Sequence, residues 1–224
     1  MASPAEERVK HMAFIETVAP ADARDAVREM YLRQQAAWGY VPNYAKVFCY
    51  RPTVMARWGQ LLAEIKRPMD KRRFELVTFV AAHELRHSAC ALAHGRALRP
   101  FFDDSQIIAI AEGHVAGVLG EPEQCLVGFA RQIARDASSV SKAQISALNQ
   151  HGFADAEIFD IAAAAAGRAF FTKLLDALGV LPDSPFLDFD QEFRRALTVG
   201  RAIDSDECAT LPVLEPAPTP WESG

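Results

Sequence analysis

The residues best suited to chemistry lie within one apolar stretch, residues 74–98, which reads FELVTFVAAHELRHSACALAHGRAL. Its ionisable groups include Glu75, His83, His87, Cys90 and His94. Neither proline nor glycine interrupts the run before Gly95, so the pattern predicts one continuous helix. At about 100° per residue, the three histidines and the cysteine fall within a sector of about 60°. We therefore expect them to form a stripe that faces a site.

The spacing within this stripe favours thiol chemistry. Cys90 and His94 are i, i+4 neighbours and His87 and Cys90 are i, i+3 neighbours, so both imidazoles can approach one sulfur. A histidine beside a cysteine lowers the pKa of the thiol or accepts its proton, which produces the nucleophilic thiolate. Glu75 joins this site only if the helix is interrupted near residues 80–84, or if a neighbouring subunit supplies its own copy. The competing interpretation makes Cys90 a small buried core residue.

A second motif in the stretch suggests a metal. The segment His83-Glu84-Leu85-Arg86-His87 matches HExxH, in which two histidines bind zinc and the glutamate activates water. A third ligand, His94, would lie about 10 Å from His87 along a straight helix, too far to share one ion without a chain reversal. No cofactor is therefore predicted. A metal held by residues drawn from His83, His87, Cys90 and His94 is the alternative.

Composition narrows the class of protein. The 224 residues carry a net charge of −5 with a pI of about 5.7, which gives no basic surplus for nucleic acid. The most apolar segment, residues 158–180, contains charged residues that argue against a membrane span: Asp160, Arg168, Lys173 and Asp176. Four scattered cysteines without a CxxC pair, and the lack of a secretory leader, favour a reducing cytoplasmic location.

The elements around the stretch are all predicted to be helical. Start and stop signals place helices at residues 20–38, 44–49, 52–65, 105–112, 123–137, 142–150, 156–178 and 190–202. Alternating strand patterns and Gly-rich phosphate loops are both missing, so the fold class is all-α. We divide the chain into an N-terminal helical arm (1–70), a core (71–182) and a C-terminal helix with an irregular acidic tail (183–224).

The motif resembles that of a known superfamily. Its pattern is a glutamate, eleven residues, Cys-x-x-Cys, three residues and a histidine, as in the alkyl hydroperoxidase D-like, peroxidase-related branch of the carboxymuconolactone decarboxylase superfamily. Glu75, Cys90 and His94 match at every spacing, and His87 stands where that branch has its first cysteine. The segments Gly39-Tyr40-Val41-Pro42-Asn43 with Arg51-Pro52, and residues 148–179, are also similar. The resemblance covers about residues 14–180.

The resemblance implies a helical bundle that forms homo-oligomers and reduces peroxides, with the glutamate and histidine relaying protons. Because His87 replaces a cysteine, a CxxC disulfide cannot form. We therefore expect a one-cysteine enzyme with Cys90 as the nucleophile, His94 as its base, Glu75 as the proton relay and His87 as a second acid–base group. A small molecule would be the substrate. Cys125, another subunit's cysteine or a small thiol reductant would resolve the sulfenic acid.

Two other functions remain open. Glu75, His87 and His94 could catalyse a non-redox lyase, isomerase or hydrolase reaction on a small organic acid or lactone, as in the decarboxylase branch. Alternatively, the chain is a non-catalytic or metal-binding oligomeric protein. The non-catalytic alternative predicts that Cys90 and His94 are fully packed, with no cavity reaching them.

Overall fold

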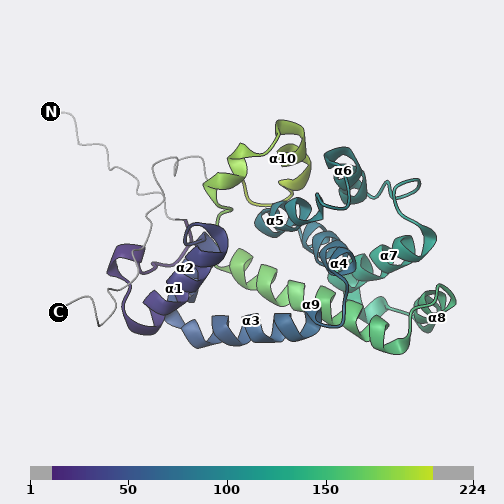
Figure 1. Cartoon of the computed structure of the whole chain (residues 1–224), viewed down its shortest axis with the longest axis horizontal. Helices are drawn as coiled ribbons and strands as arrows, with labels where there is room; N and C mark the ends of the chain where they lie inside the picture. The colour runs from purple at the N-terminus through teal and green to yellow at the C-terminus, as the bar shows by residue number, and fades with distance from the viewer. Residues whose placement is uncertain (1–11, 204–224) are drawn as a thin grey trace, which may run out of the picture.

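The computed structural model describes residues 12–203, and within this range the chain forms helices and no strand. The α-helices are α1 (Asp25–Trp38), α2 (Asn43–Val47), α3 (Pro52–Lys66), α4 (Lys71–Glu84), α5 (Ser88–Leu98), α6 (Asp104–Glu112), α7 (Glu121–Asp136), α8 (Lys142–Gln150), α9 (Asp155–Ala177) and α10 (Gln191–Leu197) (Figure 1). Short 3-10 helices occupy Pro20–Asp22, Phe48–Tyr50, Ala137–Ser139 and Ser184–Asp188. The all-α prediction is confirmed. The predicted acidic tail lies outside the described residues, and the division into arm, core and C-terminal part stays a prediction.

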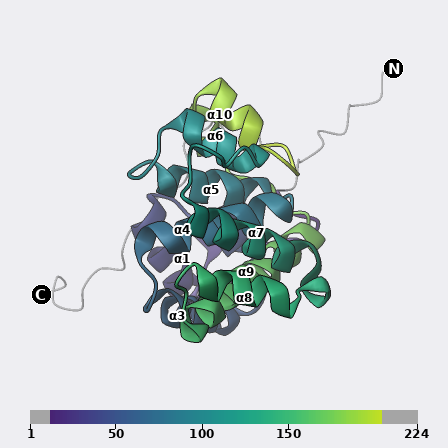
Figure 2. The ribbon, with the colours of Figure 1, turned by 90° about the vertical axis from the view of Figure 1, so that its right-hand side faces the viewer.

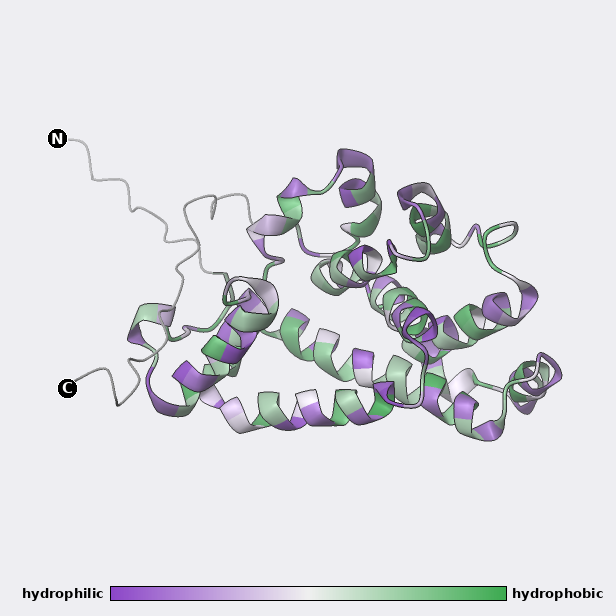
Figure 3. Cartoon of the chain, in the orientation of Figure 1, coloured by the Kyte–Doolittle hydropathy of each residue, from purple (hydrophilic) through white to green (hydrophobic). Residues whose placement is uncertain are grey.

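Helix α4 lies at the centre of the molecule, where it packs against α5, α7 and α9. Helix α3 runs along α9, while α6 and α10 cover the far side of α5 (Figures 1 and 2). Figure 3 shows that α9 is hydrophobic over most of its length, whereas α1 and α8 carry many hydrophilic residues. This difference follows from burial, because α9 is enclosed by several helices. No helix of the described part has the length and apolar character needed to cross a membrane.

The prediction of one continuous helix over residues 74–98 is wrong. Helix α4 ends at Glu84 and α5 begins at Ser88. Between them Arg86 adopts a left-handed backbone with φ of 58°. The side chain of His87 then caps α5, since its Nδ1 accepts a hydrogen bond from the backbone N–H of Cys90 at 3.1 Å. The break needs neither proline nor glycine, which is why the sequence pattern does not reveal it.

The chain that follows α10 covers this break from outside. The backbone N–H of Gly200 donates to Ser88 Oγ at 2.9 Å. A side chain at position 200 would collide with the carbonyl oxygen of Arg86, so the close approach requires glycine. The turn that separates α4 from α5 is therefore held by a distant segment as well as by its own cap.

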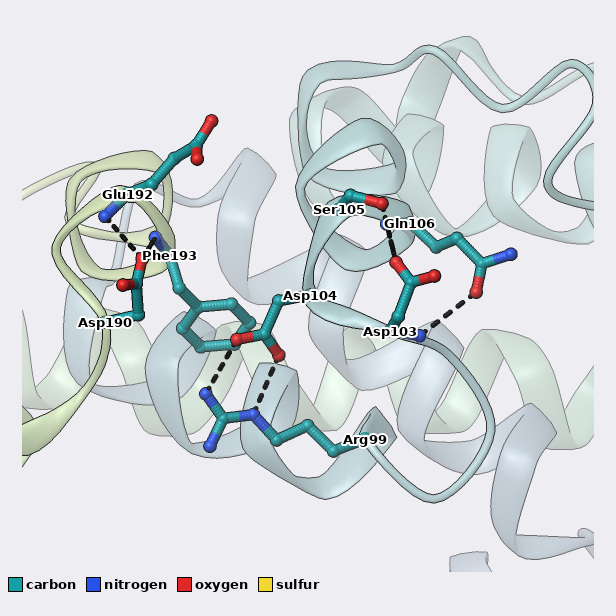
Figure 4. Close-up of polar contacts among 8 residues, drawn as sticks. All are labelled: Arg99, Asp103, Asp104, Ser105, Gln106, Asp190, Glu192 and Phe193. Carbon is teal, nitrogen blue, oxygen red and sulfur yellow. Dashed lines mark hydrogen bonds and ion pairs between the residues drawn. The ribbon is translucent and has the colours of Figure 1, made fainter.

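Side-chain caps and one arginine fix the far end of α5 (Figure 4). Asp103 caps α6 by accepting from the N–H of Gln106 at 2.8 Å, and Asp190 caps α10 in the same way. Arg99 donates to both carboxylate oxygens of Asp104, at 2.9 and 3.0 Å. Its guanidinium also lies over the ring of Phe193, 4.7 Å from the centroid. These contacts tie α5 to α6 and α10, and so hold the helix that carries Cys90.

Candidate active site

A cavity of about 360 Å³ lies between α3, α4, α5 and α9. All four predicted catalytic residues line it: Glu75, His87, Cys90 and His94. Its walls are largely apolar and include five aromatic side chains: Trp38, Tyr44, Trp58, Phe171 and Phe186. The non-catalytic alternative predicts that no cavity reaches Cys90 and His94, so this cavity argues against it. Its volume falls in the range of small-molecule sites.

The helix break brings Glu75 and His94 together within one chain. Because α5 folds back beside α4, Glu75 Oε2 lies 2.7 Å from His94 Nδ1. The interruption at residues 85–87 lies just beyond the predicted place at 80–84, and a neighbouring subunit is not required. Thr78 Oγ1 lies 3.2 Å from the same nitrogen, and Lys66 Nζ lies 3.6 Å from the other oxygen of Glu75. The pair is therefore positioned by two surrounding side chains, Thr78 and Lys66.

The electrostatics of this pair define its protonation. Burial raises the pKa of Glu75. The hydrogen bond to His94 and the charge of Lys66 lower this pKa by more than burial raises it, so it lies below its ordinary value. Burial and the charge of Arg168 lower the pKa of His94, although Glu75 acts in the opposite direction. The favoured state is a carboxylate beside a neutral imidazole, whose Nδ1–H donates to Glu75. That tautomer leaves a lone pair on Nε2, which can act as a base.

Cys90 is buried and lies close to the guanidinium of Arg168 and the imidazole of His87. Arg168 of α9 donates from Nη1 to Cys90 Sγ at 3.5 Å. Burial raises the pKa of this thiol, but the imidazole of His87 and the guanidinium of Arg168 lower it more, to about 7. The thiolate of Cys90 is therefore more accessible than that of an ordinary cysteine. This is the state that attacks an electrophile.

His87 interacts with Cys90 in two ways. Its Nδ1 accepts from the backbone N–H of Cys90, which fixes the ring at the start of α5. Burial lowers the pKa of His87, but the thiolate and the charge of Asp176 raise it above its ordinary value. The proximity of both histidines to the thiol was expected from their spacing. The imidazole that lowers the pKa of the thiol is His87, whereas the Nδ1 of His94 contacts Glu75 and Thr78.

Arg168 is the site residue that the sequence interpretation missed. There it counted only as a charge that opposed a membrane span. The side chain is 4% exposed and comes from the face of α9 that also buries Ala164, Phe171 and Leu175. A charged residue on an apolar helix face is a usable signal, because burial of an unpaired charge is costly unless a partner is present. The sequence could not show that this partner is Cys90, 78 positions away.

The two histidines of the HExxH motif, His83 and His87, do not lie on the same helix. His83 is in α4 and His87 follows the break, so the two rings do not lie one turn apart on a helix. His83 does not line the cavity, and its ring lies 6.4 Å from that of Phe79. Among residues 12–203, no three His, Cys, Asp or Glu side chains gather closely enough to hold a metal ion.

Comparison with known proteins identifies the fold. No protein-family model matches the sequence, and no curated protein sequence does either. The structure is similar to an AhpD-core, peroxidase-related protein from Ralstonia eutropha JMP134, with a TM-score of 0.69 and 20% identity over 86% of this chain and all of that one. A peroxidase-related protein from Silicibacter sp. TM1040 gives 0.66 and 20% identity over 84% and 98%. The debrominase Bmp8, in complex with 2,3,4-tribromopyrrole, gives 0.63 and 14% over 81% and 94%. The chain has the alkylhydroperoxidase D-like helical fold.

Proposed function

We propose that this chain is a one-cysteine, thiol-dependent peroxidase for small organic hydroperoxides. The observation that carries the proposal is the position of Cys90, whose thiol has a pKa of about 7 and lines an aromatic cavity together with the His94–Glu75 pair. A reactive thiolate, a base and a carboxylate that orients the base are the parts that covalent thiol catalysis requires. The alkylhydroperoxidase D-like fold supports the same assignment.

The first half-reaction oxidises the cysteine. Cys90 gives its proton to Nε2 of His94, and Glu75 stabilises the imidazolium that forms. The thiolate attacks the distal oxygen of the hydroperoxide, so that an S–O bond forms as the O–O bond breaks. The departing alkoxide takes the proton from His94. The products are Cys90 sulfenic acid and an alcohol.

In the proposed second half-reaction an external thiol reduces the sulfenic acid. His87 occupies the place of a second motif cysteine, and among residues 12–203 neither of the other cysteines, Cys49 and Cys125, lines the cavity. One external thiol condenses with the sulfenic acid to give a mixed disulfide and water. A second external thiol then attacks that disulfide, restores Cys90 and leaves as an oxidised dimer. A small thiol is thus the reductant that this proposal requires.

The proposal is tested by trapping the intermediate. Protein treated with cumene hydroperoxide and dimedone, without reductant, should carry one dimedone adduct on the Cys90 peptide in mass spectrometry. Added dithiothreitol should prevent the adduct and should support continuous hydroperoxide consumption. Labelling confined to Cys125, or consumption that does not depend on dithiothreitol, would contradict the proposal.

Two alternatives can be tested on the same protein. The contact between His94 and Glu75 would also serve acid–base chemistry on an organic acid or lactone, without any role for sulfur. Such activity would survive Cys90→Ser, whereas peroxidase activity would not. The similarity to a debrominase solved in complex with 2,3,4-tribromopyrrole makes a bromopyrrole a second small molecule to test as a ligand of this cavity.

A further inference from the structure

Arg168 is a buried guanidinium without a carboxylate partner. Its side chain is 4% exposed, and no carboxylate among the described residues forms an ion pair with it. Its Nη1 donates to Cys90 Sγ, and its Nε has no hydrogen-bond partner. Burying such a charge is costly unless an anion accompanies it. The sulfur supplies that anion only when it is ionised, and it accepts from Nη1 alone.

The other acidic groups of the cavity have partners of their own. Glu75 contacts His94 and Lys66. Asp183 accepts a hydrogen bond from the backbone N–H of Asn43 at 2.7 Å. Arginine presents five N–H donors in a planar fork, so one contact to sulfur leaves donors for a second anion. The site therefore has a place for a negatively charged group beside Cys90.

The walls around this place favour a flat, apolar body. The rings of Trp58 and Phe171 are stacked, with centroids 5.7 Å apart and planes 13° from parallel. Tyr44 meets Phe171 edge-on at 5.4 Å, and the Arg168 guanidinium lies 5.7 Å from the centroid of the same ring. Aromatic side chains bind planar rings through stacked and edge-to-face contacts. A cation at the base of such walls suits an aromatic ring that carries negative charge.

We propose that the cavity binds an aromatic anion, a ring bearing a carboxylate or ionised hydroxyl, with its charged group on Arg168 and its ring among the aromatic walls. This inference rests on the proposed function and deepens it, because such a ring would be the organic part of the hydroperoxide that the same site reduces. The bound anion and the thiolate share one guanidinium. Removing the sulfur by Cys90→Ala should therefore strengthen binding of the anion, and bound anion should slow alkylation of Cys90 in the wild type.

The test uses unreactive probes and calorimetry on the full chain. 2-Naphthoate should bind to wild type at least about tenfold more tightly than neutral 2-naphthamide, since the guanidinium forms stronger hydrogen bonds with an ionised acceptor than with a neutral one. Arg168→Gln should remove this preference. The matched control is Arg57→Gln, because Arg57 is an exposed arginine that does not line the cavity. It should bind both probes as the wild type does.

Equal binding of the two probes by the wild type would overturn the inference, as would unchanged naphthoate binding by Arg168→Gln. The comparison of probes on the wild type needs no variant, so it stands even if Arg168→Gln fails to fold. Binding also needs no thiol chemistry. A protein that forms no sulfenic acid but prefers naphthoate would contradict the peroxidase proposal and support the aromatic-anion site. A protein that forms the sulfenic acid but binds both probes equally would support the peroxidase proposal and contradict the aromatic-anion site.

Discussion

Replacing Cys90 with serine should reduce dithiothreitol-dependent hydroperoxide consumption to the rate of the uncatalysed reaction. A hydroxyl group does not ionise near neutral pH and cannot be oxidised to a sulfenic acid, so both halves of the cycle are lost. Serine differs from cysteine by one atom, and the cavity around it is retained. The measurement is the decrease of cumene hydroperoxide with time in the presence of excess dithiothreitol.

The matched control for this variant is Cys125→Ser. Cys125 lies in α7 outside the cavity, and burial raises the pKa of its thiol. Its replacement should leave the rate unchanged. If Cys90→Ser kept half of the activity, or if Cys125→Ser lost most of it, the catalytic sulfur would lie elsewhere.

Glu75→Gln should lower the turnover rate by about 10²–10⁴-fold, the usual contribution of general acid–base catalysis. The carboxylate of Glu75 contacts Nδ1 of His94, and in the proposed mechanism it stabilises the imidazolium that forms when Cys90 gives up its proton. Glutamine has nearly the same shape but no charge, so the imidazole loses both its orientation and its counter-ion. The loss should appear in kcat at saturating hydroperoxide.

Helix α4 offers a closely matched control for Glu75→Gln. Glu84 contacts Arg135 at 2.8 Å and Arg131 at 3.5 Å, and it does not line the cavity. Glu84→Gln removes the same charge from the same helix and should keep full activity. Similar rates for the two variants would show that Glu75 has no part in proton transfer.

Most of the helices, and three of the residues that line the cavity, could be predicted from the sequence. Caps such as Asp103 and terminators such as Gly179 mark helix ends locally, so most predicted ranges agree with the structure to within a few residues. The spacing of Glu75, Cys90 and His94 likewise selected three residues that line one cavity. Local chemistry determines both features, which is why they can be read from short stretches of chain.

The break between α4 and α5 could not be predicted in the same way. It depends on Arg86 accepting a left-handed backbone and on His87 acting as a helix cap, a role usually filled by Ser, Thr, Asp or Asn. Contact with the remote Gly200 supports it. Without the break, Glu75 would lie far from His94. The helix prediction therefore missed the break that brings these two residues together.

The electrostatics of the thiol also depend on tertiary structure. The spacing placed both His87 and His94 near Cys90, and the resemblance to the superfamily implied His94 as the base, a role that stays a prediction. In the structure the pKa of the thiol is lowered by His87 and Arg168 against the effect of burial. Arg168 reaches Cys90 from α9, and no pattern around residue 90 could indicate it.

The most direct test of this account is the pH dependence of Cys90 alkylation by iodoacetamide, followed on the Cys90 peptide by mass spectrometry. In the wild type the rate should rise with pH through a midpoint of about 7, because the thiolate is the reactive form. In His87→Asn, which keeps a capping side chain but loses the imidazole, and in Arg168→Met, the midpoint should move up toward the ordinary value of about 8.5. A wild-type midpoint at that ordinary value, or a Cys90 that stays unreactive at every pH, would contradict the claim that this cysteine is an activated nucleophile.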